Sequence, residues 1–280
     1  DGIERVLAAH ARPGDHVAVE DPGYLSVLDL CSALGLLVVP VPVDAGGCIP
    51  AALEAVLPRV RACVFTPRGQ NPTGASWDAR RAMQLGTLLV RRPEVLSIID
   101  DHAAGVAGTP LQVMRQGPQW AYLRSVSKGW GPDLRVAILA GDAVTVARVE
   151  GRRALGTGWV SQLLQRVVVE LWTDPAVERQ LAHATAEYAR RREAMLAALH
   201  RQGIAASASS GINVWIPVAH EEEVGAALLA EGWGIALGAR FRIAAPPAIR
   251  VTTAALRPGE APAFAAALSR ALHGTATRFG

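Results

Sequence analysis

The residue with the clearest potential for chemistry is the only lysine of the chain, Lys128. The other 27 of its 28 basic residues are arginines, so arginine stands almost everywhere that a positive charge is sufficient. A neutral amine can form an imine with a carbonyl compound, whereas a guanidinium stays protonated and cannot. The retained lysine therefore indicates covalent chemistry at this position, and chance retention is the alternative.

Lys128 belongs to a polar segment, residues 125–135, that directly follows a predicted strand. The segment supplies the hydroxyls of Ser125 and Ser127, two glycines and the guanidinium of Arg135. Hydroxyl, backbone N–H and guanidinium groups bind phosphate, so the segment suits a phosphate held beside a reactive amine. Serine and glycine are also common in ordinary loops, and that interpretation stays open.

Two carboxylates, Asp100 and Asp101, end the apolar run 95–99. A buried carboxylate without a partner is costly, so this position needs a cation or a hydrogen-bond donor. A protonated pyridine nitrogen is both, and the ion pair would keep the nitrogen charged so that the ring can accept electrons. The alternative is an ordinary pair of aspartates at the start of a loop.

Two more polar segments follow predicted strands. Asn71 precedes Pro72, and a residue before proline is held in an extended or turn conformation, so its amide can be aimed at a fixed point. Tyr24 stands at the entry of a predicted helix, where its ring can stack on a flat ligand. A simple turn and ordinary aromatic packing are the respective alternatives.

The elements that must position these residues alternate between strand and helix. Apolar runs predict strands over residues 17–20, 36–41, 62–66, 95–100, 121–125 and 136–140, and helical patterns cover 24–34, 49–57 and 76–90. This alternation predicts an α/β fold with a mostly parallel central sheet flanked by helices. Ligands of such sheets bind beyond the carboxyl ends of the strands, where the polar residues above fall.

Length and composition predict two domains. The chain has 280 residues, of which 50% are hydrophobic, and domains average about 150 residues. We expect a large α/β domain over residues 1–150, then a linker helix and a small α+β domain over 151–280. The small domain has predicted strands at 213–218, 234–237 and 249–252 and helices at 221–231 and 258–272. The arginine run 190–192 is predicted to be a solvated helix face.

Other features exclude some classes of protein. No apolar run approaches the roughly 18 residues of a membrane span, so we expect a cytoplasmic protein. The net charge of +3 comes from scattered residues, which does not indicate a DNA-binding surface. The three cysteines lack metal-ligand spacing, so we expect buried thiols and no metal site. Helical spacing begins at Asp1 without a cap, so we expect a piece of a longer protein.

The polar segments, taken in order, resemble pyridoxal 5'-phosphate (PLP) enzymes of fold type I, in the class I and II aminotransferase group. Within that group the sequence is most similar to the aminotransferase-like domain of MocR/GabR-type transcriptional regulators. The phrases that carry this resemblance are VEDPGY (19–24), VPVD (41–44), TPRGQNPTG (66–74), DDH (100–102) and IRVT (249–252). The resemblance extends along essentially the whole chain.

The resemblance implies a PLP-binding site. By matching positions, Lys128 forms a Schiff base with PLP and Asp100 pairs with the pyridinium nitrogen. Asn71 donates to the phenolic oxygen of PLP, and Tyr24 stacks on the ring. The residues implied to bind the phosphate are Ser125, Ser127 and Arg135.

The resemblance also implies a site for a substrate or effector. Arg250 matches the arginine that holds an α-carboxylate by a bidentate fork. Without that role it is an edge-strand charge. Asn213 either lines the same cleft or makes a structural hydrogen bond. His102 is a departure from the family, which usually has a tyrosine donating to the phenolic oxygen near this place, and histidine titrates near neutral pH.

Two functions fit these residues. A degenerate protein scaffold that binds no cofactor is the third alternative. The first is an effector-sensing domain that binds PLP and an amino acid or amine and relays the change to a DNA-binding domain upstream. The second is a metabolic aminotransferase, in which Lys128 also moves a proton. The site residues are nearly the same in both, so the sequence leaves turnover undecided. The resemblance further implies a homodimer.

Overall fold

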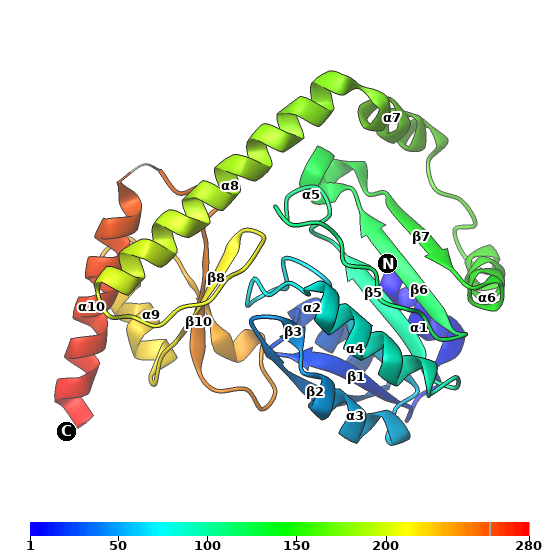
Figure 1. Cartoon of the computed structure of the whole chain (residues 1–280), viewed down its shortest axis with the longest axis horizontal. Coiled ribbons are helices and arrows are strands. Elements are labelled where there is room, and N and C mark those ends of the chain that lie inside the picture. The colour runs from blue at the N-terminus through cyan, green and yellow to red at the C-terminus, as the bar shows by residue number, and fades with distance from the viewer. Residues whose placement is uncertain (258, 280) are drawn as a thin grey trace.

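Seven strands form one sheet within residues 1–257 and 259–279, the part of the chain that the structure, a computed structural model, describes (Figure 1). The strand order is β3-β2-β1-β4-β5-β6-β7. The five inner strands are parallel, and the edge strands β3 and β7 are antiparallel to their neighbours. The strands are β1 (His16–Asp21), β2 (Leu37–Asp44), β3 (Gly47–Cys48), β4 (Ala62–Phe65), β5 (Leu96–Asp101), β6 (Trp120–Ser125) and β7 (Ala137–Gly141).

Helices before, between and after these strands cover both faces of the sheet. They are α1 (Gly2–His10), α2 (Leu25–Ala33), α3 (Pro50–Val56), α4 (Ala79–Val90), α5 (Ser127–Trp130) and α6 (Ala143–Ala154), with short 3-10 turns η1 (Leu57–Arg59) and η2 (Pro132–Leu134). Nearly all residues of β1, β4 and β5 are buried, so these strands are mainly apolar before their polar ends, whereas β2 and β6 are partly exposed. The predicted fold class is confirmed.

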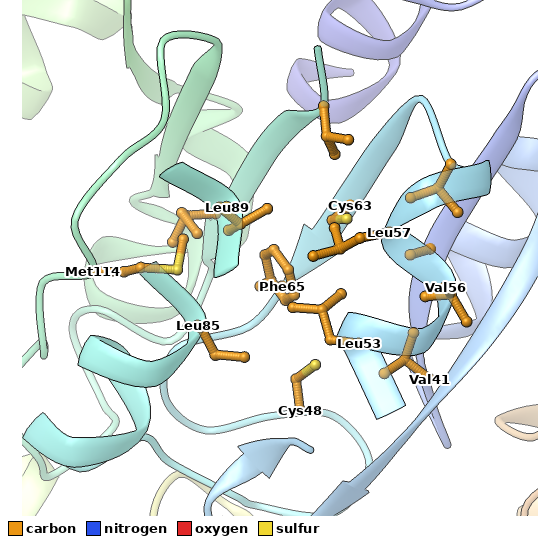
Figure 2. Close-up of a cluster of buried hydrophobic side chains, with 14 of the residues drawn as sticks. Val41, Cys48, Leu53, Val56, Leu57, Cys63, Phe65, Leu85, Leu89 and Met114 are labelled. Carbon is orange, nitrogen blue, oxygen red and sulfur yellow. The ribbon is translucent and has the colours of Figure 1, made fainter. Parts of the chain in front are cut away.

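Residues of the inner strands alternate between two cores. Cys63 and Phe65 of β4 belong to the cluster under α3 and α4, together with Leu53 and Leu85 (Figure 2). Ala62 and Val64, one residue out of step, belong to the cluster on the opposite face with residues of α1 and α2. All three cysteines are buried and free, as expected. The same two-residue period decides where polar residues at the strand ends point.

The second part of the chain holds a three-stranded antiparallel sheet of order β8-β10-β9 within the described residues. The long helix α8 leads to this sheet (Figure 1). Residues of α8, α9 and α10 form one hydrophobic cluster with residues of β8 and β10. The bounds are α7 (Gln162–Thr173), α8 (Pro175–Arg201), β8 (Asn213–Pro217), α9 (Glu221–Ala230), β9 (Ala236–Leu237), η3 (Gly238–Arg240), β10 (Ala248–Thr252) and α10 (Glu260–Phe279).

The structure corrects some details. The helix predicted over 76–90 begins at Ala79, because the Asp78 carboxylate accepts from the Arg81 N–H and caps it. The run 190–192 is not entirely solvated, since Arg192 is buried and donates to the Gly211 carbonyl. The helix predicted over 258–272 corresponds to α10, and residue 258 lies outside the described residues. Among those residues no helix is long and apolar enough to cross a membrane.

The two sheets are joined by a carboxylate at the end of β1. Asp21 is buried and accepts hydrogen bonds from three consecutive backbone N–H groups, of Ile243, Ala244 and Ala245, at 2.8 to 2.9 Å. Two residues later, the Gly23 N–H donates to the carbonyl of Phe241. These bonds join residues more than 200 positions apart and hold the loop before β10 against the large sheet.

We expect Asp21→Ala to lower the free energy of unfolding by about 3 kcal/mol, because three charge-assisted bonds are lost and three backbone donors lose their acceptor. Chemical denaturation followed by circular dichroism measures this. Asp29→Ala, at an exposed position of α2, is the matched control and should change stability by less than about 0.5 kcal/mol. Equal effects of the two substitutions would refute the joining role of Asp21.

Candidate functional site

The predicted site residues gather at one edge of the large sheet. Strands β1, β4, β5 and β6 are parallel neighbours, so their carboxyl ends lie side by side. Tyr24 follows β1, and Asn71 follows β4. Asp100 is the last but one residue of β5, and Lys128 follows β6. The parallel order of the strands is therefore what brings these four distant segments together.

The two aspartates at the end of β5 face opposite sides of the sheet. Asp101 has the same parity as Ile99, which lies in the core under α4. It is fully buried and accepts two hydrogen bonds of 2.8 Å from Arg68 and one of 2.6 Å from the Tyr122 hydroxyl. Asp100 has the parity of Ile98 and faces the other side. Of the two aspartates, Asp100 is therefore the one that can contact a ligand at the site.

Lys128 lies in the short helix α5, three residues beyond the end of β6. Its side chain is exposed, and no hydrogen bond or ion pair joins its amine to another residue of the described chain. The surrounding protein nevertheless removes enough water to lower the pKa of the amine; the Asp100 carboxylate opposes this shift and the Arg250 cation adds to it. The amine, the carboxylate and the guanidinium are thus close enough to influence one another.

Arg250, on β10, reaches across to the large sheet. Its Nη1 donates a hydrogen bond of 3.0 Å to Oδ1 of Asn71, and its guanidinium lies 4.7 Å from the ring centroid of Phe241. Burial lowers its pKa, and the nearby Arg240 cation does so too. Its Nε is buried and has no hydrogen-bond partner within the described chain. An arginine held in this way keeps donors free for an anionic ligand.

Tyr24 and His102 both lie near Asp100. Tyr24 precedes α2 and keeps 45% of its surface exposed, above a hollow of about 20 Å³ that Asp100 also lines. The Tyr24 hydroxyl is close enough to Arg250 to influence its pKa. His102 Nδ1 lies 3.6 Å from Oδ2 of Asp100, too far for a hydrogen bond, and this buried nitrogen has no hydrogen-bond partner in the described residues.

The remaining predicted residues are less clearly gathered. The Ser125 hydroxyl accepts from the Ser127 N–H at 3.3 Å, which folds the two serines together beside Lys128. Arg135 is exposed and donates to the Pro132 carbonyl instead of bonding either serine. Asn213 is buried and accepts a hydrogen bond of 2.9 Å from the Thr252 hydroxyl, so the structural interpretation of this residue is the one with an observed contact.

Residues behind the site were not singled out as site residues from the sequence. Arg68 neutralises Asp101, and Glu20 lies buried near Asp100, accepting from the Thr66 N–H and from the Gln70 amide. Burial raises the pKa of Glu20 to about 7, and the Asp100 charge adds to the shift. One signal was available in the sequence: a glutamate that continues an apolar strand is buried and therefore needs partners.

The donor set fits PLP. A Schiff base needs an amine with a lowered pKa, a pyridinium needs a carboxylate, and an amino acid carboxylate needs a free guanidinium. Lys128, Asp100 and Arg250 supply these groups in one place. The buried Nε of Arg250 and Nδ1 of His102 both lack hydrogen-bond partners within the described chain. A ligand that reaches them can satisfy these polar atoms.

Comparison with known proteins gives a consistent result. The sequence matches the family described as aminotransferase class I and II over residues 1–268. It is 42% identical, over 98% of the chain, to the vitamin B6 salvage pathway transcriptional repressor PtsJ of Salmonella typhimurium. It is 29% identical, over 76% of the chain, to the aminotransferase tdiD of Emericella nidulans. The chain spans 65% of the length of the first relative and 55% of the second.

Solved structures share the fold. The α-aminoadipate aminotransferase LysN of Thermus thermophilus, complexed with N-(5'-phosphopyridoxyl)-L-leucine, superimposes with a TM-score of 0.87 at 24% identity. The match covers 99% of this chain and 76% of that chain. The fold-type I architecture and the similarity to MocR-type regulators, both expected from the sequence, are therefore confirmed.

Glu20 makes the stability of the fold depend on pH. Its pKa is raised from 4.5 to about 7, so between these values the fold retains a proton that the unfolded chain has released. We expect the free energy of unfolding to fall by about 3 kcal/mol as pH rises through this window. Denaturation at a series of pH values measures the slope.

In Glu20→Gln the titration is removed, so the slope should become flatter. Glu54→Gln, at an exposed position of α3, is the control and should retain the slope of the unmodified protein. If both variants retain it, the pH dependence does not come from Glu20.

Proposed function

The chain belongs to the aminotransferase class I and II family, and from that premise we propose that it is the effector-sensing domain of a GntR/MocR-type transcriptional regulator that binds PLP as a Schiff base on Lys128. The identity of 42% to a transcriptional repressor, against 29% to an aminotransferase, supports the regulator over the enzyme. The repressor's name connects it to vitamin B6, which is the vitamin from which PLP is made.

The observation that carries the proposal is that the only lysine amine lies close enough to Asp100 and Arg250 for both charges to act on its pKa. Bound PLP supplies an aldehyde for this amine and a ring that accepts electrons. The lowered pKa of Lys128 increases the fraction of neutral, nucleophilic amine at neutral pH. Asp100 accepts from the ring nitrogen and keeps it protonated. Because Asp101 forms an ion pair with Arg68, Asp100 is the carboxylate that remains to bind the ring nitrogen.

Other residues orient the cofactor in this proposal. Asn71 uses Oδ1 to accept from Arg250, which leaves its amide N–H groups to donate to the phenolic oxygen. Tyr24 stacks on the ring from its position before α2. His102 stands where the family usually has a tyrosine and donates toward the same oxygen. The Ser125 and Ser127 hydroxyls bind the phosphate, and Arg135 does so after its exposed side chain turns from Pro132.

The effector is an amino acid or an amine. A carboxylate binds the guanidinium of Arg250, which Phe241 supports from one side. Asn213 lines the cleft beside it on β8. Because Arg250 also bonds Asn71 of the large sheet, a carboxylate that takes over these donors changes how the two parts of the chain are held together. That change is the signal relayed to DNA through a domain upstream of this chain.

A metabolic aminotransferase is the second candidate. Its support is the lowered pKa of Lys128, which increases the fraction of neutral amine that can accept a proton from an amino acid and return it. In that case the same site transfers an amino group between an amino acid and a 2-oxo acid. Half-reaction spectroscopy distinguishes the two, because an enzyme completes repeated cycles when a 2-oxo acid is added and a sensor stops after one exchange.

We also infer a homodimer. Large apolar side chains are exposed on α7, on the connection before it and on β7; they are Ile138, Trp159, Val160, Leu163, Val167, Val169 and Trp172. Surfaces of this kind mark protein interfaces. We further propose a cytoplasmic location, which suits a regulator, and a division of the chain near residue 150 into a large and a small domain.

We expect the protein at its natural length to develop the visible absorption band of a Schiff base with PLP, and Lys128→Ala to lack this band after removal of free PLP. Lys128→Arg is the matched variant that keeps a positive charge but cannot form an imine, so it should lack the band as well. Absorption spectra of the gel-filtered proteins measure this. A band that persists in both variants contradicts the assignment of Lys128.

We expect Arg250→Ala to weaken the spectral response to amino acids by about 100-fold while PLP stays bound, because a bidentate charge-assisted pair contributes about 3 kcal/mol. Titration of the PLP-loaded protein with a panel of amino acids measures this. Arg240→Ala removes a neighbouring exposed cation and is the control, with an expected change of less than threefold. Loss of PLP from Arg250→Ala would show that Arg250 holds the cofactor instead.

A further inference from the structure

A second polar pocket lies at the opposite edge of the large sheet, where β1 and β4 begin. It has a volume of about 580 Å³ and is lined by residues 8–12, Asp15, Arg61 and Arg148. Small-molecule pockets commonly measure about 300 to 1,000 Å³. Because β1 has six residues at about 3.3 Å each, roughly 20 Å separate this edge from the candidate PLP site. The pocket is therefore a separate place in the fold.

Positive charge dominates this pocket. Arg12, Arg61 and Arg148 line it, and within residues 1–257 and 259–279 none of the three forms an ion pair with a carboxylate. Arg61 donates to the Glu94 carbonyl at 3.2 Å. The lining carboxylate, Asp15, accepts from the backbone N–H of Arg12. Three guanidinium groups beside a single carboxylate repel one another, and an anion bound among them reduces the repulsion.

A buried histidine lies among these arginines. His10, in the last turn of α1, is only 8% exposed, and its Nδ1 lies 3.3 Å from Nη1 of Arg148. Its Nε2 is buried and has no hydrogen-bond partner within the described residues. Burial lowers the pKa of His10, as do the cations of Arg148 and Arg61, while Asp142 opposes them. Burial and the two cations therefore disfavour the protonated ring, and an anion bound nearby would offset the part that comes from the cations.

The positions of these groups are fixed by regular structure. His10 and Arg148 come from α1 and α6, which pack against each other, and Arg61 directly precedes β4. The turn after α1 is closed by a hydrogen bond from the Asp15 N–H to the Arg12 carbonyl. Three guanidinium groups thus approach the pocket from three different elements, which matches an anion with three terminal oxygens better than a planar carboxylate.

We propose that the pocket formed by His10, Arg12, Arg61 and Arg148 binds the phosphate group of a small-molecule phosphate monoester. The three arginines bind the terminal oxygens. His10 either donates a hydrogen bond to the anion or contacts Arg148 and fixes the position of its guanidinium. The remaining volume holds the organic part of the ligand. This site is independent of the PLP site, since it lies at the other edge of the sheet and shares no residue with it.

Isothermal titration of the PLP-saturated protein with glycerol 3-phosphate and with inorganic phosphate tests the proposal. Saturation with PLP occupies the phosphate-binding residues at the other edge, so they do not contribute. We expect Arg148→Gln and Arg61→Gln each to weaken binding of both probes by about 10-fold or more. Arg152→Gln removes a cation from the exposed surface of the same helix as Arg148 and should change binding by less than twofold. Succinate should bind more weakly than the phosphates.

NMR of the His10 ring provides a second readout, with His10→Gln used to assign the signal. Because a bound phosphate offsets the charges of Arg148 and Arg61, the pKa of His10 should rise when either probe is added. An unchanged His10 titration, or an equal loss of affinity in Arg152→Gln, overturns the proposal. So does binding of random duplex DNA that the pocket variants abolish while glycerol 3-phosphate fails to bind, because the pocket is then a contact for nucleic acid.

Discussion

Two adjacent carboxylates end β5, and the pleat of the strand sends them to opposite faces of the sheet. Asp101 turns toward the core under α4, where Arg68 and Tyr122 satisfy its oxygens and cancel its charge. Asp100 faces the other side of the sheet and is close enough to Lys128 to act on the pKa of its amine. If both carboxylates faced the same side, their repulsion would favour a proton on one of them and weaken the partner for a cofactor. The ion pair of Arg68 with Asp101 therefore preserves the role that we propose for Asp100.

The site also depends on contacts between the two sheets. Arg250 lies on the small sheet but bonds Asn71 of the large one, and Asp21 of the large sheet holds the loop 243–245 before the strand of Arg250. A ligand bound at Arg250 thus acts on groups that also join the two parts of the chain. In a sensor, this arrangement converts the binding of a carboxylate into a change of position between domains. In an enzyme, the same change closes the site over the substrate.

Much of the fold follows from local sequence patterns. Apolar runs of strand length, separated by amphipathic helices, are enough to predict a mostly parallel sheet, and the position of Tyr24, Asn71, Asp100 and Lys128 at one edge follows from it. The two-residue edge strand β3 was not predicted, because it is too short to carry a periodic pattern. Patterns within one segment are therefore sufficient for the inner strands but not for the edge.

Contacts between distant segments could not be predicted in this way. Arg68 and Asp101 are 33 residues apart and Asp21 and Ile243 are 222 apart, and nothing in their local sequence specifies the partner. The burial of Arg192 depends on the Gly211 carbonyl, which only the packing of α8 brings within reach. Arg135 has a left-handed backbone conformation, with φ of 49°, directly after the turn η2, which its sequence also does not predict. Such features arise from tertiary structure.

The most direct test of the account is to identify the atom that carries the cofactor. The protein at its natural length is incubated with PLP, reduced with borohydride to fix any imine, digested, and analysed by peptide mass spectrometry. The account predicts a phosphopyridoxyl group on the peptide that contains Lys128. A group found only on the N-terminal amine or on lysines outside these 280 residues, or no group at all, contradicts it.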